Sequence, residues 1–443
     1  MAKKIQQVNK AKSDRKMLRS LIAIPVLALF VKIIIICNIE AGSWLGADGE
    51  NYVTGVIGLI KDGFFSSEPK LSFWPAGYPI LMWPIAAINT AHFFYVVSIL
   101  QSVFFGYSTF FATREISKAS IRNFAVPASL IITLNPTLSL NSLSIGYEAP
   151  VAASLLMALG FSIRILNSSN EDQKEKLISG IFLSAWFALA IFMQPRFLLA
   201  GFAVVLVVAM KTSGKTFKLK FLSLSLIILI IAPAVMIVRN NQAINNPTIS
   251  TNLGVTMAIG AGPSTSGSYV HEGPEVPCSA KPGADVVSDS QRVKCVIDWY
   301  LKNPLRTAKL AFNKSMYFWS PWTGPLANGT MARNPWLKIS PAYTSTKNKD
   351  GSDLILGPFG RLISYLWIIG QVLFLLLGFF ALRRRGEFEK IIAWLLISPV
   401  LISWMISIGT IGDHRFRVPT MSLSLILQVI GMLAISKRIS KAT

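Results

Sequence analysis

Two acidic residues, Asp48 and Glu50, lie in the stretch GADGENY, directly after the first long apolar run of the sequence. A carboxylate at such a boundary either caps a helix or serves as a base that accepts a proton. Tyr52 and Val56 follow at helical spacing, which predicts an amphipathic interfacial helix that ends near Asp62. We take Asp48 as the candidate catalytic base and give Glu50, which would point in another direction on a helix, a secondary place.

A second set of residues could hold a phosphate group near that base. Arg239, Arg415 and Arg417 lie at the ends of apolar runs, and Arg196 follows a proline between two of them. The guanidinium group is a planar fork of N–H donors that fits phosphate oxygens, although an arginine at a helix end can also simply snorkel toward water. We expect His414, which lies beside Arg415 and Arg417 in the sequence, to act as a hydrogen-bonding neighbour.

Glu148 opens another apolar run, where a helix N-terminus would favour a negative charge. The residue therefore caps a helix or contacts the substrate. A divalent ion bridged by Asp48 and Glu148 is an alternative that we do not favour, so we predict no metal and no cofactor. Tyr78 lies in FWPAGYPILMWP, whose aromatic residues suit the interfacial belt of a membrane and whose prolines stiffen the turn.

The elements that must position these residues are membrane helices. Of the 443 residues 52% are hydrophobic and only 14% are charged, and the apolar runs are long enough to cross about 30 Å of hydrocarbon. Backbone groups in lipid must be satisfied internally, so the runs predict an all-α polytopic membrane protein. We predict about ten spans, at 18–39, 93–112, 123–142, 146–165, 177–193, 197–211, 219–238, 359–382, 390–408 and 418–436.

The net charge of +22 is explained by topology more simply than by nucleic acid, which we do not expect as a partner. Lys and Arg concentrate in the short segments on the side of the N-terminus, which places both termini in the cytoplasm of a cell membrane. Lys32 is the exception, inside the first span. The predicted divisions are a basic tail at 1–17, a membrane module at 18–238, an extracytoplasmic segment at 239–357, membrane helices at 358–436 and a tail at 437–443.

Two outer segments, 40–92 and 239–357, are too long to be simple turns and should hold the chemistry. The second is rich in Gly, Pro and aromatic residues, and we interpret it as a loop domain of mixed structure on the membrane surface. Cys278 and Cys295 lie in it, and two cysteines in one exported loop favour a disulfide over a reduced pair. The sequence contains no P-loop, which disfavours an ATP-driven pump.

Four stretches resemble, in the same order, the GT-C glycosyltransferases, closest to the bacterial relatives of protein O-mannosyltransferases and of the lipid A aminoarabinose transferase. The first is Asp48-x-x-x-Tyr52 followed by WPAGYP from Trp74. The others are RNNQAINNPTISTNLG from Arg239, WYLKNPLRTAKLAFNKSMYFW from Trp299, and GDHRFRVP from Gly412. Ala261 and Gly262 stand where that branch often has Gly-Asn, which bears on the substrate more than on the fold.

The resemblance implies a GT-C-like fold, a sugar donor on a polyprenyl phosphate and an exported acceptor hydroxyl. Asp48 would then be the base of an inverting single displacement, and the arginines, with Tyr52, Tyr78, Glu148 and His414, would line the donor site. Membrane lipids are the remaining partner. The alternatives are a lipid-linked glycan flippase or other transporter, a polysaccharide polymerase or ligase, and a non-catalytic component of envelope assembly.

Overall fold

The computed structural model describes residues 2–38, 48–169, 172–212, 214–263, 265–268, 288–320 and 358–442. All regular structure in these residues is helical, and no strand occurs among them. Among the described residues, eight helices are long and apolar enough to cross a membrane, or nine when a bent pair of shorter helices is counted as one further span. The all-α polytopic class predicted from the sequence is therefore confirmed.

The eight helices that qualify as spans share a length of at least 18 residues and a strongly apolar window. They are α1 (Ala2–Cys37), α5 (Phe93–Lys118), α8 (Glu148–Asn167), α9 (Gln173–Met193), α11 (Lys215–Ile244), α18 (Pro358–Arg383), α19 (Glu387–Gly409) and α20 (Val418–Ala442).

Two of the ten predicted spans differ in the structure. The span at 123–142 is broken into α6 (Ala125–Leu134) and α7 (Pro136–Leu140), and the pair bends by 61°. Pro136 has no N–H to continue the helix, and the Asn135 side chain accepts a hydrogen bond from the backbone N–H of Leu138 and so starts the second helix. The span at 197–211 is α10 (Leu198–Lys211), whose 14 residues rise only about 21 Å.

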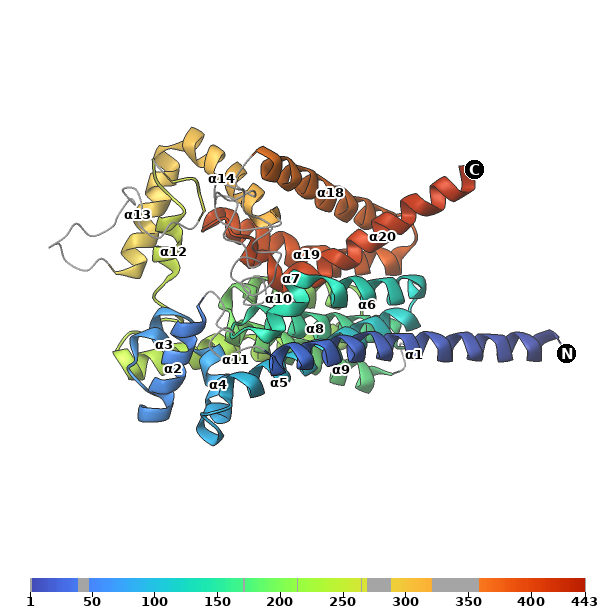
Figure 1. The fold of residues 1–443 in the computed structure, drawn as a ribbon, viewed down its shortest axis with the longest axis horizontal. Helices are drawn as coiled ribbons and strands as arrows, with labels where there is room; N and C mark the ends of the chain where they lie inside the picture. The colour runs from blue at the N-terminus through green and yellow to red at the C-terminus, as the bar shows by residue number, and fades with distance from the viewer. Residues whose placement is uncertain are drawn as a thin grey trace.

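The first outer loop forms three helices, α2 (Gly49–Asp62), α3 (Pro69–Phe73) and α4 (Gly77–Ile88). The described part of the second outer segment forms α12 (Leu253–Ile259), α13 (Asp289–Lys302) and α14 (Pro304–Trp319). Figure 1 shows α2, α3 and α13 at one end of the bundle and both termini at the other. The described helices α2, α3 and α13 of these two segments thus lie at the end of the bundle opposite the termini.

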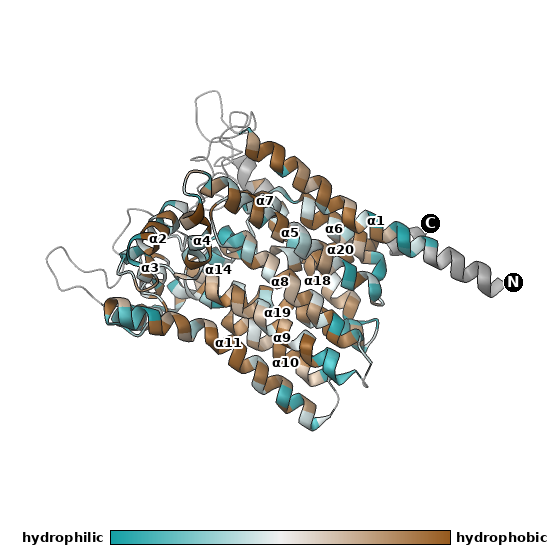
Figure 2. Ribbon diagram, turned by 90° about the horizontal axis from the view of Figure 1, so that it is seen from below, coloured by the Kyte–Doolittle hydropathy of each residue, from teal (hydrophilic) through white to brown (hydrophobic). Residues whose placement is uncertain are grey.

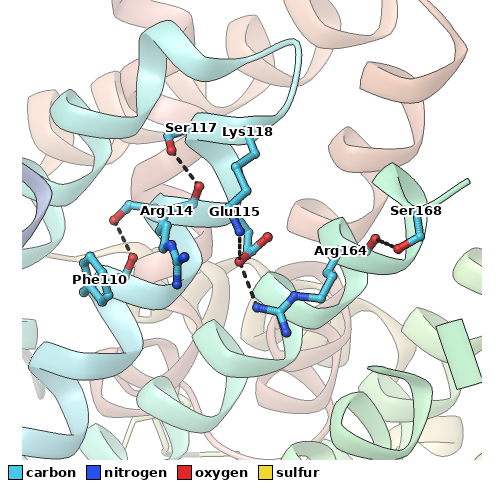
Figure 3. Close-up of polar contacts among 8 residues, drawn as sticks. Phe110, Arg114, Glu115, Ser117, Lys118, Arg164 and Ser168 are labelled. Atoms are coloured by element: carbon cyan, nitrogen blue, oxygen red, sulfur yellow. Dashed lines mark hydrogen bonds and ion pairs between the residues drawn. The ribbon is translucent and has the colours of Figure 1, made fainter. Parts of the chain in front are cut away.

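Helix α8 forms the centre of the bundle, because 89% of its apolar window is buried and it packs against α5, α9 and α20. Close contact with α5 requires Gly160, where a Cβ atom would lie 2.5 Å from the Phe111 ring. At the end of the bundle near the N-terminus, Glu115 is buried and pairs with both Lys118 and Arg164, at 2.8 Å and 2.9 Å, which connects α5 to α8 (Figure 3).

The outer surface of the bundle is apolar, as expected for helices that face lipid. Figure 2 shows long hydrophobic stretches in α1 and α11, with hydrophilic residues before the stretch in α1 and toward the ends of α11. Lys32 of α1 is a charged residue inside the first predicted span, where it must either extend toward the membrane surface or face the bundle. It faces the bundle, where its ammonium donates to Ser142 Oγ at 2.9 Å and lies 4.8 Å from the centre of the Phe105 ring.

Candidate functional site

Three of the predicted site residues meet at one ion-pair cluster, which we call the carboxylate cluster: Asp48, Glu148 and Arg415. Arg415 Nη1 lies 2.6 Å from Asp48 Oδ2, and Arg415 Nε pairs with Glu148 Oε1. The side chains are 22%, 7% and 13% exposed for Asp48, Glu148 and Arg415, so the group is largely withdrawn from water but Asp48 is still open. A single guanidinium thus holds two carboxylates that are 100 positions apart in the chain.

Local structure explains why each member lies at this place. Asp48 is the residue before α2, and Glu148 is in the first turn of α8, where the helix dipole favours an anion. Arg415 belongs to the short 3-10 helix η6 (His414–Arg417), and Asp413 starts this helix by accepting a hydrogen bond from the backbone N–H of Arg415 at 2.8 Å. The prediction that α2 starts after Asp48 and ends at Asp62 is confirmed.

Three buried tyrosines line one side of the cluster. The Tyr52 ring packs edge-on against Tyr78 at 5.1 Å and Tyr147 at 6.4 Å between ring centres. Burial, reinforced by the negative charge of Asp48, raises the pKa of Tyr52 well above its usual value. The phenol is therefore neutral and able to donate a hydrogen bond toward a ligand. Tyr147 directly precedes Glu148 in the sequence, but sequence reasoning did not single it out.

Tyr78 is buried in the fold, in the stretch whose aromatic residues suit the interfacial belt. It is only 3% exposed, and its hydroxyl donates to Gln101 Oε1 at 3.0 Å and accepts from the backbone N–H of Gly146 at 2.9 Å. A buried phenol needs such partners, and these partners come from α5 and from the turn before Glu148. Tyr78 therefore fixes the first outer loop against the segment that carries Glu148.

Arg196 is a second guanidinium beside the carboxylate cluster. It lies in the 3-10 helix η4 (Pro195–Phe197), 4.4 Å from the centre of the Phe416 ring and 5.7 Å from that of Tyr147. Its Nη2 donates to the Tyr147 hydroxyl at 3.5 Å, and its Nε is buried with no hydrogen-bond partner in the described part of the chain. Burial lowers the pKa of Arg196 from its usual value.

The structure does not bring Arg239 into the cluster. This fully buried residue of α11 donates to the backbone oxygens of Leu71 at 3.1 Å and Phe64 at 3.3 Å, and also to that of Ser66. A further bond joins it to Asn240 Oδ1 at 2.7 Å. Its donors therefore hold the first outer loop on α11, and a phosphate contact there stays an untested prediction that this geometry does not favour.

Arg417 has a similar position at the start of α20. Its Nη1 donates to the backbone oxygen of Trp319 at 3.1 Å and to Gln371 Oε1 at 2.5 Å. These contacts join the end of α14 and the middle of α18 to η6. His414 is 1% exposed, and neither of its ring nitrogens has a hydrogen-bond partner within the residues that the structure describes. Its predicted role as a hydrogen-bonding neighbour remains open.

Lys314 of α14 connects the outer segment to the membrane helices. Its Nζ donates to the backbone oxygens of Ile408 at 3.1 Å and Thr410 at 2.7 Å, which are free acceptors at the end of α19, and to the Tyr300 hydroxyl at 2.8 Å. Burial lowers the pKa of Lys314 to about 7. The contact fixes the loop that runs from α19 to η6 and thus to Arg415.

Two remaining predictions concern cysteines and metals. Cys295 lies in α13, whereas Cys278 lies outside the described residues, so the disulfide stays a prediction. In the described ranges, no three His, Cys, Asp or Glu side chains are grouped closely enough to hold a metal ion. Arg415 pairs with the carboxylates of both Asp48 and Glu148.

Comparisons with known proteins give no family. No family model and no curated protein matches the sequence. Among solved structures, the archaeal oligosaccharyltransferase AglB from Archaeoglobus fulgidus, in complex with an inhibitory peptide and a dolichol-phosphate, has 11% identity and a TM-score of 0.47 over 96% of this chain and 52% of its own. The Archaeoglobus fulgidus oligosaccharyltransferase in the apo form has 13% identity and a TM-score of 0.47, over 95% of this chain and 51% of its own.

A third structure, the same archaeal enzyme tethered to an acceptor peptide through a disulfide bond, has 12% identity and a TM-score of 0.43, over 94% of this chain and 50% of its own. The chain thus spans about half the length of the structures that it matches. Because the three TM-scores are below 0.5, these matches establish neither the family nor the activity of this protein.

Proposed function

We propose that this protein is a membrane glycosyltransferase that moves a hexose or pentose from a polyprenyl-phosphate donor to an exported acceptor hydroxyl. The observation that carries the proposal is the convergence of Asp48 and Glu148 on Arg415, at the end of the bundle where the outer segments gather. On the resemblance of its motifs, we place it with the GT-C glycosyltransferases, near the bacterial O-mannosyltransferase and aminoarabinose transferase branch. Both termini would be cytoplasmic and the site extracytoplasmic.

The reaction needs a base but no general acid. As the acceptor oxygen forms its bond to the anomeric carbon, Asp48 takes the acceptor proton, and the bond from that carbon to the phosphate oxygen breaks. The electron pair leaves with the lipid phosphate, which is a good leaving group without protonation. Attack from the face opposite the leaving group inverts the anomeric configuration.

Asp48 suits the role of base better than Glu148 does. Its side chain is 22% exposed, against 7% for Glu148, so an acceptor can reach it from water. Glu148 is fixed in the first turn of α8, and we assign it to positioning Arg415. When Asp48 receives the proton, its attraction for Arg415 weakens, and Nη1 becomes free to donate to an oxygen of the departing phosphate.

The test is a comparison of Asp48→Asn with Glu50→Gln in a strain that lacks the gene. Glu50 is an exposed acid two positions further along α2, which makes Glu50→Gln a matched control for the loss of one negative charge in the same loop. Mass spectrometry of envelope lipids, glycans and secreted proteins would identify the missing sugar. Wild type and Glu50→Gln should restore it, and Asp48→Asn, present at normal level in the membrane, should not.

Two results would contradict the proposal. If Asp48→Asn restores the modification as well as wild type does, the carboxylate is not the base. If the deletion strain accumulates a complete lipid-linked glycan on the inner leaflet while its transfer to acceptors in isolated membranes is intact, the protein is a flippase instead. The identity of the missing sugar would name the donor and the acceptor together.

A further inference from the structure

The buried and partly buried arginines at this end of the molecule differ in how their N–H donors are used. A guanidinium has five N–H donors and no acceptor. Arg239 and Arg417 direct theirs at backbone and amide oxygens, and Arg415 directs its own at two carboxylates. Arg417 Nε has no partner either, but Arg196 uses the fewest of its donors in the described part of the chain. Its one hydrogen bond, to the Tyr147 hydroxyl, has a length of 3.5 Å, and it forms no ion pair within the described ranges.

Three aromatic rings surround the guanidinium of Arg196. The ring of Phe416 lies 4.4 Å away, and those of Phe197 and Tyr147 lie 5.2 Å and 5.7 Å away. Aromatic rings stabilise a cation over their faces but accept few of its N–H bonds. Such a platform holds a planar fork in a fixed orientation, which is the condition for bidentate binding of an oxyanion.

The position of Arg196 relative to the carboxylate cluster is set by sequence neighbours. Phe416 follows Arg415 in the chain, and Tyr147 precedes Glu148. The centre of the Tyr147 ring is 5.4 Å from the Arg415 guanidinium as well, so one ring is shared by both cations. The N-terminus of α10 begins two residues after Arg196, and its free N–H groups also favour an anion.

We propose that Arg196 binds the phosphate of the lipid-linked donor, with its guanidinium held by Phe416 and Tyr147 and its unpaired N–H groups directed at the phosphate oxygens. The nature of this ligand rests on the proposed function. Arg196 would hold the phosphate in place of Arg239 and Arg417, whose donors bind other parts of the chain. It would stabilise the charge that grows on the phosphate as the bond to the sugar breaks.

The experiment measures binding of three lipids to the full chain in nanodiscs of phosphatidylcholine by native mass spectrometry. Undecaprenyl phosphate tests the phosphate, undecaprenol has the same chain without it, and phosphatidylglycerol represents an ordinary anionic headgroup. A charge-assisted bidentate contact predicts that wild type prefers undecaprenyl phosphate over undecaprenol by about 10-fold or more. Arg196→Gln should abolish most of this preference, and Arg196→Lys should keep part of it.

Arg114→Gln is the matched control, because Arg114 is exposed and lies near the C-terminal end of α5, beside Glu115 (Figure 3). It should bind all three lipids as wild type does. If Arg196→Gln or Arg196→Lys keeps the full preference, the inference fails, while the proposed transfer still stands with another cation. If wild type shows no preference for the phosphate, both fail. Equal binding of phosphatidylglycerol would also overturn the inference, since the site would then recognise phospholipid headgroups in general.

Discussion

Removing Arg415 should damage the protein in a different way from neutralising Asp48, although the two form one ion pair. In Asp48→Asn, Arg415 still pairs with Glu148, and the new amide oxygen can still accept a hydrogen bond. In Arg415→Gln, the carboxylates of Asp48 and Glu148 remain side by side without a cation. Both are largely withdrawn from water, at 22% and 7% exposure, so neither charge is well solvated.

The magnitudes follow from these contacts. Removing one partner of a buried ion pair typically costs about 3–5 kcal/mol, because the remaining charge is left uncompensated. We expect the free energy of unfolding to fall by about this amount in Arg415→Gln, where two carboxylates lose their partner. In Asp48→Asn one charge-assisted bond becomes a neutral one, which corresponds to about 1 kcal/mol. The loss of activity should be more selective in Asp48→Asn than in Arg415→Gln. Asp48→Asn removes the base and should lower kcat by about 10²-fold or more while the protein still folds.

A double variant separates charge repulsion from lost packing. Arg415→Gln combined with Glu148→Gln leaves only one carboxylate, so part of the lost stability should return, with a coupling energy of about 0.5–3 kcal/mol. The assay is denaturant unfolding of wild type, Asp48→Asn, Arg415→Gln, Glu148→Gln and the double variant in one detergent, together with single-turnover transfer for those that fold. Equal and small losses in Arg415→Gln and Asp48→Asn, or no recovery in the double variant, would show that Arg415 does not hold the two acids together.

Further predictions concern the parts that support the site. Because the pKa of Lys314 lies near 7 in the fold and near 10.5 in the unfolded chain, the unfolded chain binds more protons between these values. The free energy of unfolding should therefore rise with pH in this window, by at most about 1.4 kcal/mol per pH unit. Lys314→Met should lack this contribution to the rise, which denaturant unfolding at a series of pH values would measure. Gly77→Ala should lower the unfolding midpoint, by about 1–3 kcal/mol in stability, because its Cβ atom would lie 1.8 Å from a carbonyl oxygen of α9, whereas Gly370→Ala, with no neighbour within 4 Å, should not. Cys278 and Cys295 should be joined in non-reducing peptide mapping, and recovery of both as free thiols from an oxidising compartment would remove the bridge.

The sequence predicts helices and candidate charged residues better than it predicts which groups those residues contact. Apolar length alone indicated the membrane helices, since the lipid allows few other structures. Asn135-Pro136 was a visible signal for the bend in the third span, but it lies inside a continuous apolar run. Arg239 and Arg417 were recognisable as cations near a boundary, yet their acceptors are backbone oxygens from segments far away in the chain. Which acceptor a guanidinium meets depends on packing, and no local pattern encodes it.

The same reasoning explains why the sequence gives Arg196 only as one of several candidate cations and does not rank it above Arg239 or Arg417. It lies in a short turn with no repeated motif, and its significance depends on Tyr147 and Phe416, which come from distant segments. Only when these segments are assembled does the contrast between used and unused N–H donors become visible. For Glu148, the position at a helix start was predictable from the sequence, but its ion pair with Arg415 was not.

The charges at the site are suited to a reaction in which negative charge moves but does not change in amount. In the proposed reaction, the donor phosphodiester and Asp48 each carry one negative charge before transfer. Afterwards Asp48 is neutral and the released lipid phosphate carries two, so the total is unchanged. Arg415, 2.6 Å from Asp48, and Arg196, beside the shared Tyr147 ring, form a fixed pair of positive charges across which this shift takes place. Because the net charge of the site stays constant, the reaction needs no large rearrangement of water at a place where little water reaches, and the protein's own cations provide the stabilisation in advance.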